Sequence, residues 1–182
     1  MGRNEHAASF LATTQRVLVM LGAAFWSSLS VACEKYPLDF LTPLVGEWNQ
    51  FRVDGTERTF LGTLRSELAA GGCALVQYFE SPNGEFSYVS LSAFEDDGVF
   101  VERYALSTGR MAVYQWDNSA ERLQQIRLVN KPNEKRHFVF LDITDKSYFI
   151  ADERSDDGGD TWRRVELVQL VRRAAAGQPS SD

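Results

Sequence analysis

Leu44-Val45-Gly46-Glu47-Trp48 is the stretch that decides the fold of this chain. It is the first place after the N-terminal region at which a β-strand can begin. Gly46 lacks a side chain and permits a close approach of backbone, and the indole of Trp48 is large enough to close the end of a barrel. The chain that follows contains strand-like runs that can wrap around this indole. The stretch therefore predicts the first strand of a β-barrel.

Ten strand-like runs follow one another along the chain, each bounded within a few residues by Gly, Pro, Asn or Asp. They cover residues 45–53, 58–68, 73–80, 85–94, 99–106, 111–116, 122–129, 137–143, 148–154 and 162–172. No stretch between them is long enough for the crossover helix that parallel pairing requires. We therefore expect an all-β fold, a meander of about ten antiparallel strands. Closure into a barrel would remove its two exposed edges.

Two local details of this barrel can also be predicted. Apolar residues between Leu38 and Leu44 are expected to form a short helical turn before the first strand, ended by Pro43. In the second run, strict alternation places Phe60, Leu64 and Leu68 on one face of the strand.

Residues 1–32 have the order of a secretory signal peptide, with basic residues first, then an apolar run from Val17 to Trp26, then the small residues Ser30-Val31-Ala32. The apolar run is shorter than the ~20 residues that a membrane span needs. We expect residues 33–173 to form the barrel domain and residues 174–182 a disordered tail. The protein is accordingly expected to be exported, either periplasmic or secreted.

The two cysteines allow two interpretations. Cys33 directly follows Ala32, as in a bacterial lipobox, although Leu29 stands one position too early and Ser30 occupies the usual leucine position. Ordinary secretion is therefore preferred to a lipid anchor on Cys33, which would be the protein's one attachment to a membrane. After export, Cys33 and Cys73 can form a disulfide, or Cys73 can stay as a small buried residue.

The composition is that of a globular protein with an aromatic-rich interior. The formal net charge is −6, which argues against general nucleic-acid binding because that function needs a basic face. Twelve Phe, six Tyr and four Trp are suited to strands and to a barrel interior.

A sharp local motif spans Ser155 to Trp162, with the sequence Ser-Asp-Asp-Gly-Gly-Asp-Thr-Trp. It resembles the Asp-box at every fixed position. That resemblance implies a tight hairpin in which Asp157 accepts turn amides, Gly159 takes the strained backbone and Trp162 packs on the turn. The motif is structural in its families, and we expect it to join the last two strands without a catalytic role.

The Leu44–Trp48 opening, the meander and the late Asp-box-like turn together resemble the DUF1579 group of bacterial proteins over Leu38 to Arg172. This group is similar in fold to the calycins, which include lipocalins and fatty-acid-binding proteins. Gly46 and Trp48 match the lipocalin G-x-W pattern. The resemblance implies a basic side chain laid across Trp48, supplied by Arg172 or Arg173. No C-terminal helix is expected, and residues 54–57 are too few for a helical lid.

The sequence offers no catalytic residue and no metal site. Neither a catalytic triad nor a zinc-binding cluster can be assembled, because His137 is the one histidine after the predicted signal peptide. The opening also resembles nitrobindin-like haem barrels, which need a proximal histidine, but a lone histidine at a strand start is more often structural. We expect no cofactor and keep haem as a minority interpretation.

The expected function is the binding of a small apolar or amphipathic molecule inside the barrel. An isomerase- or lyase-type enzyme using the same cavity and an interaction module with a filled core are the alternatives. The predicted ligand-binding residues are Trp48, Phe86, Tyr88, Tyr104, Trp116, Arg127 and Phe140. Trp48 is expected to close one end, and Arg127 to hold a carboxylate or phosphate head group through its planar donor fork.

Other polar strand residues are less readily assigned to a face. They are Glu102, Gln115, Asp142, Asp152, Arg164 and Glu166. Most of these are expected to face solvent and a few to face the ligand.

Overall fold

The structure is a computed structural model that describes residues 38–117, 123–128 and 133–174. These residues belong to one compact unit that begins at Leu38. The predicted signal peptide, Cys33 and residues 175–182 of the predicted tail lie outside the described residues. No helix within the described ranges is long and apolar enough to cross a membrane.

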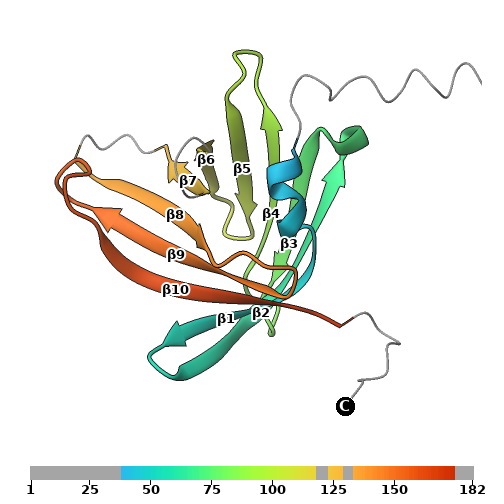
Figure 1. The fold of residues 1–182 in the computed structure, drawn as a ribbon, viewed down its shortest axis with the longest axis vertical. Helices are drawn as coiled ribbons and strands as arrows, with labels where there is room; N and C mark the ends of the chain where they lie inside the picture. Colours follow the sequence, from blue (N-terminus) through green and yellow to red (C-terminus); the bar gives the residue numbers. More distant parts are fainter. Residues whose placement is uncertain (1–37, 118–122, 129–132, 175–182) are drawn as a thin grey trace, which may run out of the picture. The chain divides into compact units, whose positions relative to one another are not determined.

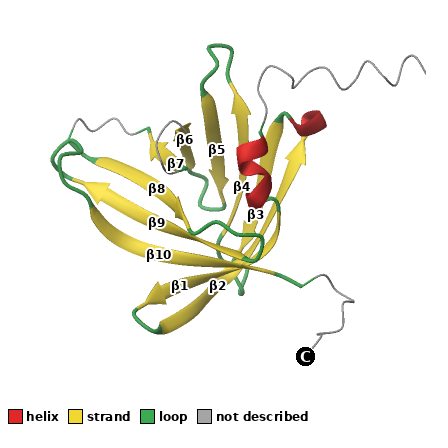
Figure 2. Ribbon diagram, in the orientation of Figure 1, coloured by secondary structure: helices red, strands yellow, loops and turns green. Residues whose placement is uncertain are grey.

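The described residues form one short 3-10 helix, η1, and ten main strands (Figures 1 and 2). The helix covers Asp39–Leu44, and a single 3-10 turn, η2, covers Ala70–Gly72. The strands are β1 (Gly46–Asp54), β2 (Glu57–Ala69), β3 (Ala74–Glu80), β4 (Ser87–Phe94), β5 (Phe100–Leu106), β6 (Met111–Asp117), β7 (Gln124–Arg127), β8 (Lys135–Leu141), β9 (Ser147–Ser155) and β10 (Arg163–Arg172).

Each strand pairs antiparallel with the next in sequence, and β1 pairs antiparallel with β10, so the sheet is a closed barrel. The register of the closing pair places Trp48 opposite Arg172 and Gln50 opposite Leu170. Closure leaves no strand edge unpaired, which is the physical advantage of this arrangement for a long meander. The predicted all-β fold, its strand order and its closure are confirmed.

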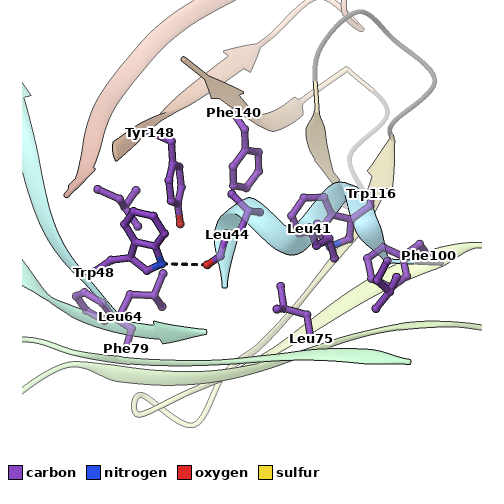
Figure 3. Packing of buried hydrophobic residues seen from close by; sticks show 12 residues of the cluster. Leu41, Leu44, Trp48, Leu64, Leu75, Phe79, Phe100, Trp116, Phe140 and Tyr148 are labelled. Atoms are coloured by element: carbon purple, nitrogen blue, oxygen red, sulfur yellow. Dashed lines mark hydrogen bonds between the residues drawn. The ribbon is translucent and has the colours of Figure 1, made fainter. Parts of the chain in front are cut away.

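Aromatic and leucine side chains close one end of the barrel (Figure 3). Leu41 and Leu44 of η1 are fully buried there with Trp48. The Trp48 indole N–H donates to the Leu44 carbonyl at 2.9 Å, and its ring meets Tyr148 edge-on with centroids 4.9 Å apart. Trp116 stacks on Phe140 at 5.2 Å. The predicted helical turn therefore exists, and its apolar side is part of this plug.

Pro43 lies inside η1 and does not end it. The helix continues to Leu44, and the Val45 N–H closes it on the Thr42 carbonyl at 3.1 Å. Proline is compatible with this position because its fixed φ is close to helical and the short turn needs no hydrogen bond from its nitrogen. The expected end of the helix was wrong by one residue.

Arg172 is the basic residue that covers Trp48. Its guanidinium carbon lies 4.1 Å from the indole centroid, and Nη1 donates to the Val45 carbonyl at 3.0 Å. Arg173 instead reaches Glu47 at 3.4 Å on the surface. Gly46 has φ +136°, and a Cβ there would collide with Arg172 Nη1. The group that approaches Gly46 closely is therefore the Arg172 guanidinium. The sequence had suggested a close approach of backbone at this position.

A β-bulge changes the face pattern of β2. The register against β1 shifts between Gln50 and Phe51, so that Gly62 lies opposite Gln50 but Phe60 lies opposite Phe51. Phe60 and Phe51 then contact each other, with ring centroids 5.5 Å apart and Phe60 exposed. Strict alternation therefore placed Phe60 on the wrong face, because one extra residue inverts the pattern on one side of a bulge. Leu68 is exposed as well.

The Asp-box residues form the turn between β9 and β10, as predicted. Asp157 accepts from the Thr161 amide at 3.0 Å and from the Thr161 hydroxyl at 2.6 Å. Ser155 Oγ donates to Asp157 at 2.6 Å, and the Trp162 indole N–H donates to the Gly159 carbonyl at 3.0 Å. These hydrogen bonds lower the pKa of Asp157 well below its usual range.

Candidate functional site

A cavity of about 500 Å³ occupies the barrel interior on the other side of the plug. Its wall is largely aliphatic and aromatic, and includes Leu61, Leu64, Phe79, Leu106, Phe138, Ile150 and Val168. Alternation along the strands produces this wall, since the inward positions of successive strands face one space. A mostly apolar, partly enclosed space of this size is typical of a small-molecule site.

Five of the seven predicted site residues line this cavity. They are Phe86, Tyr88, Tyr104, Arg127 and Phe140. Phe86 precedes β4 and is 38% exposed, and its ring contacts those of Phe79 and Tyr88. Tyr88 stacks on Phe79 at 5.2 Å and meets Tyr104 edge-on at 5.2 Å.

The two predicted tryptophans lie beneath the cavity and do not line it. Trp48 is fully buried in the plug, so it closes one end of the barrel as expected. Trp116 is buried in the same cluster, stacked on Phe140 and 6.0 Å from the Phe100 ring. Both tryptophans therefore belong to the plug that closes the barrel below the cavity.

Arg127 brings a positive charge to the cavity wall. It stands opposite Tyr114 on β6 and is half-buried. Within the described ranges, no carboxylate lies within ion-pair distance of its guanidinium. A half-buried guanidinium without a counter-ion is a favourable position for an anionic group of a ligand.

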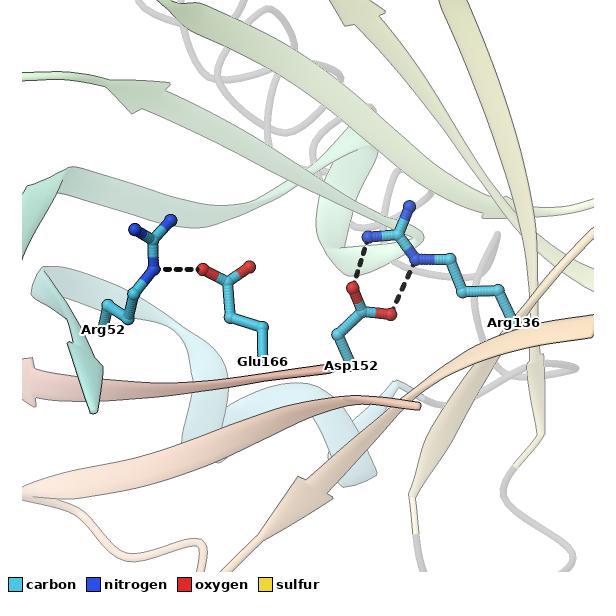
Figure 4. A network of polar contacts seen from close by, with 4 residues as sticks. All are labelled: Arg52, Arg136, Asp152 and Glu166. Carbon is cyan, nitrogen blue, oxygen red and sulfur yellow. Dashed lines mark hydrogen bonds and ion pairs between the residues drawn. The ribbon is translucent and has the colours of Figure 1, made fainter. Parts of the chain in front are cut away.

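Two ion pairs lie at the open end of the cavity (Figure 4). Arg136 binds Asp152 through two hydrogen bonds, Nε to Oδ1 at 2.7 Å and Nη2 to Oδ2 at 2.5 Å. Arg52 Nε donates to Glu166 at 2.6 Å. A second pocket of about 640 Å³ adjoins these residues and is lined by Arg154 and Arg164 among others. Arg154 Nε is buried there without a hydrogen-bond partner among the described residues.

The floor of the cavity is polar. Tyr104 Oη donates to Gln125 Oε1 at 3.3 Å, and Gln125 Nε2 donates to Glu102 Oε2. Beside them, Gln77 Nε2 donates to Ser66 at 2.9 Å. Burial raises the pKa of the Glu102 carboxyl above its ordinary value. Burial, and then the nearby Glu102, also raises the pKa of Tyr88 and of Tyr104, so both phenols keep their protons.

The expectation that most polar strand residues face solvent was wrong for several of them. Glu102 and Asp152 are buried, and Glu166 lines the cavity with Arg127. The apolar residues Val89 and Leu91 instead face outward and are exposed. A strand with apolar residues on both faces does not reveal which of its faces is inside.

Sequence reasoning missed the glutamines. Gln50, Gln77 and Gln125 are buried, and all three line the cavity. Gln50 and Gln77 each stand two residues from a buried aromatic on their own strand, Trp48 and Phe79, and Gln125 stands two residues after Leu123, which precedes β7 and packs against the core. That spacing is the signal that would have placed them on the inner face.

His137 does not fit the haem interpretation. It alternates with Phe138, which lines the cavity, and so lies on the outer face of β8. Its ring stacks on Trp162 with centroids 3.7 Å apart, and Nε2 is 2.9 Å from Glu153 Oε2. A ring held in this way on the outside cannot ligate an iron in the barrel. The described residues also contain no group of three or more His, Cys, Asp or Glu placed to hold a metal ion.

Cys73 is disulfide-bonded, so the alternative of a free buried thiol at this position is wrong. The expected pairing involves Cys33, which lies outside the described residues.

Comparison with known protein families found no match for this chain, and comparison with curated proteins found none either. The assignment of the fold therefore comes from the structure itself. A closed antiparallel barrel of ten strands in sequential order, with a short helical turn before the first strand, fits the calycin-like fold that the sequence indicated.

Proposed function

We propose that this protein binds a small amphipathic molecule in its barrel cavity, with an anionic end directed to Arg127. The observation that carries the proposal is an apolar cavity of about 500 Å³ whose wall includes the Arg127 guanidinium, which has no carboxylate partner among the described residues. The apolar wall favours a hydrocarbon chain or ring system, because burying it removes apolar surface from water. The guanidinium favours a carboxylate or phosphate at one end of that molecule.

The arrangement of charges at the open end supports this orientation. Arg52 and Arg136 each have an internal carboxylate partner, whereas Arg127 has none among the described residues. A ligand anion would therefore be bound most strongly by Arg127. The empty volume above the plug also supports ligand binding over the alternative of an interaction module with a filled core.

The test compares an anionic and a neutral probe of the same chain length. Decanoic acid and methyl decanoate are titrated into the wild type and into Arg127→Ala by calorimetry. We expect Arg127→Ala to weaken decanoate binding by about 1.5–3 kcal/mol, the usual contribution of a charged hydrogen bond. Methyl decanoate should bind both proteins equally.

Arg110→Ala is the matched control, because Arg110 is an exposed arginine in the turn between β5 and β6. It should leave both affinities unchanged. Absence of decanoate and ester binding to the wild type would refute the proposal. Equal binding of decanoate to wild type and Arg127→Ala would refute the role of Arg127.

We also propose that the protein is exported and is a member of the DUF1579 group. The order of charge, apolar run and small residues in 1–32 supports export, and the Leu44–Trp48 opening with its Asp-box-like turn supports the group. N-terminal sequencing of protein from the cell envelope should find a chain that begins after Ala32. A lipid on Cys33 would identify the anchored form. A chain that still begins at Met1 would contradict export.

A further inference from the structure

A row of arginines crosses three neighbouring strands at the open end of the barrel. Arg136 of β8 stands directly opposite Arg154 of β9. Ile126 of β7 stands opposite His137 of β8, so the next position along these antiparallel strands places Arg127 beside Arg136. Arg127 and Arg136 line the apolar cavity, and Arg136 and Arg154 line the adjoining pocket of about 640 Å³. We call Arg127, Arg136 and Arg154 the arginine row.

The arginine row carries more positive charge than the neighbouring carboxylates neutralise. Like charges directly opposite one another on a sheet destabilise it. Asp152 neutralises the middle arginine, accepting one hydrogen bond from Arg136 Nε and one from Nη2 (Figure 4). Among the described residues, no carboxylate forms an ion pair with Arg127 or Arg154, and Arg154 Nε is buried without a hydrogen-bond partner. Two of the three guanidiniums are therefore held without a counter-ion, and this costs free energy that a bound anion would recover.

The other charged groups that line the two pockets do not supply this counter-ion. Arg52 is paired with Glu166 at 2.6 Å, and Arg164 reaches Glu153 at 3.7 Å. Asp54 lines the second pocket but is exposed, so solvent and salt screen its charge. The excess positive charge at the open end therefore belongs to the two outer members of the arginine row.

We propose that the arginine row binds a phosphate monoester, so that the ligand of the barrel is an amphiphile whose head group carries two negative charges. A phosphate monoester presents three terminal oxygens, all strong hydrogen-bond acceptors, and guanidinium is well suited to bind them. Its oxygens would accept from Arg127 on the side of the apolar cavity and from Arg154 on the side of the second pocket. This inference rests on the proposed function and names the head group of its ligand.

A carboxylate suits the arginine row less well than a phosphate. Its single charge and its two coplanar oxygens are satisfied by one guanidinium. Neighbouring strands lie about 4.8 Å apart, so the backbones of Arg127 and Arg154 are roughly 10 Å apart, on either side of Arg136. The oxygens of a phosphate are arranged as a tetrahedron and can accept from guanidiniums that approach from opposite sides. Both outer arginines can therefore bind one phosphate.

The test titrates decyl phosphate, decyl sulfate and decanoate into the wild type by calorimetry. The titrations are made at pH 8, where a phosphate monoester carries two charges, and at one ionic strength. Decyl sulfate is the control for shape, because its head group is tetrahedral but has a single charge. We expect decyl phosphate to bind at least about tenfold more tightly than either of the others, the gain from a second charged contact.

The outcomes separate this inference from the proposed function. If decanoate binds and decyl phosphate binds equally or more weakly, the inference is overturned and the proposed function stays intact. If none of the three probes binds, both are overturned.

Arg154→Gln locates the second charged contact. In this variant the advantage of decyl phosphate over decanoate should fall to less than about threefold, because one of the two charged contacts is lost. Decanoate affinity should stay that of the wild type, because Arg127 and the apolar wall are unchanged. The ratio of two affinities within one protein is insensitive to a general loss of stability. Arg110→Gln, at the exposed arginine between β5 and β6, should keep the wild-type ratio. A wild-type ratio in Arg154→Gln would overturn the inference.

Inorganic phosphate separates the head group from the chain that carries it. It should displace decyl phosphate from the wild type only at concentrations about a hundredfold higher or more, because it buries no hydrocarbon against the apolar wall. This result would support a phosphorylated amphiphile as the ligand. Inorganic phosphate that binds as tightly as decyl phosphate would make free phosphate the ligand of the arginine row, and would overturn both the inferred amphiphile and the proposed function.

Discussion

Arg172 connects three residues that are far apart in sequence. Its guanidinium lies over Trp48, donates to the Val45 carbonyl and occupies the space that a side chain on Gly46 would need. Gly46 and Trp48 match the lipocalin G-x-W pattern, and that resemblance limited the basic residue over Trp48 to Arg172 or Arg173. It did not separate these two, because the choice depends on the register between β1 and β10, which places Arg172 opposite Trp48.

The first prediction concerns this arginine. Arg172→Ala should lower the free energy of unfolding by about 2–3 kcal/mol, since it removes a cation–π contact and hydrogen bonds to backbone carbonyls that stay partly buried. Urea denaturation followed by tryptophan fluorescence measures this. Arg173→Ala is the matched control, and should change stability by less than about 0.5 kcal/mol because its pair with Glu47 is exposed. Equal effects of the two variants would contradict this assignment.

The second prediction concerns the pH dependence contributed by Glu102. Its pKa is raised above the ordinary value of 4.5, so between 4.5 and the raised value the native state binds more protons than the unfolded state. The unfolding free energy of the wild type should therefore fall as pH rises through this interval. Glu102→Gln lacks this contribution. Its stability relative to the wild type should increase with pH in urea titrations between pH 4.5 and 8, and a pH-independent difference would contradict the prediction.

At the scale of elements, the sequence predicted hairpins better than strand faces. The Asp-box turn between β9 and β10 follows from local chemistry, since Ser155, Asp157 and Thr161 bond to groups within four residues of one another. The face of Phe60 follows from a bulge between β1 and β2. There Gly62 has φ +151°, and a Cβ on it would collide with the Glu80 carbonyl of β3. That constraint comes from two neighbouring strands and is invisible in the local sequence.

The third prediction tests the Asp-box hairpin. Asp157→Ala should lower the melting temperature. It should also speed hydrogen exchange of the Thr161 amide, which donates a hydrogen bond to Asp157. Because the pKa of Asp157 is lowered, its contribution is present above the ordinary value of 3.8 and is lost as pH falls below it. The difference in stability between wild type and variant should therefore disappear in acid.

Asp156→Ala is the control for the same hairpin. Asp156 is exposed, and its one ion pair with a described residue is with Arg163, at 3.5 Å. It should leave both the melting temperature and the Thr161 exchange rate unchanged. Decanoate affinity should be the same in the two variants, because the hairpin does not line the cavity. A loss of decanoate affinity without a loss of stability in Asp157→Ala would show that the turn is functional.

The whole barrel consists of layers along its axis. An aromatic and leucine plug closes one end, a polar floor follows on the side of β3 to β7, and an apolar wall leads to the ion pairs at the open end. Strand number, antiparallel order and closure were predictable, because turn residues and run lengths are local. The layers were not, because each depends on which residues of neighbouring strands stand at the same level.

The last prediction tests whether the interior is a site for a ligand, by filling it. Ala112 on β6 lines the cavity and stands opposite Tyr104 of β5. Ala105, the residue after Tyr104, faces outward and is exposed. Ala112→Trp should place an indole in the empty volume and reduce decanoate affinity at least tenfold. The cost in stability should be small, since existing space and not packed core receives the ring.

Ala105→Trp makes the same chemical change on the exposed neighbour, so it separates the effect of a new indole from the effect of a filled cavity. It should keep wild-type decanoate affinity. Binding to the wild type should also raise the melting temperature with increasing decanoate concentration, because the ligand binds only the native state. Ala112→Trp should lose this dependence and Ala105→Trp should retain it. Undiminished decanoate binding by a folded Ala112→Trp protein would place the ligand outside the barrel.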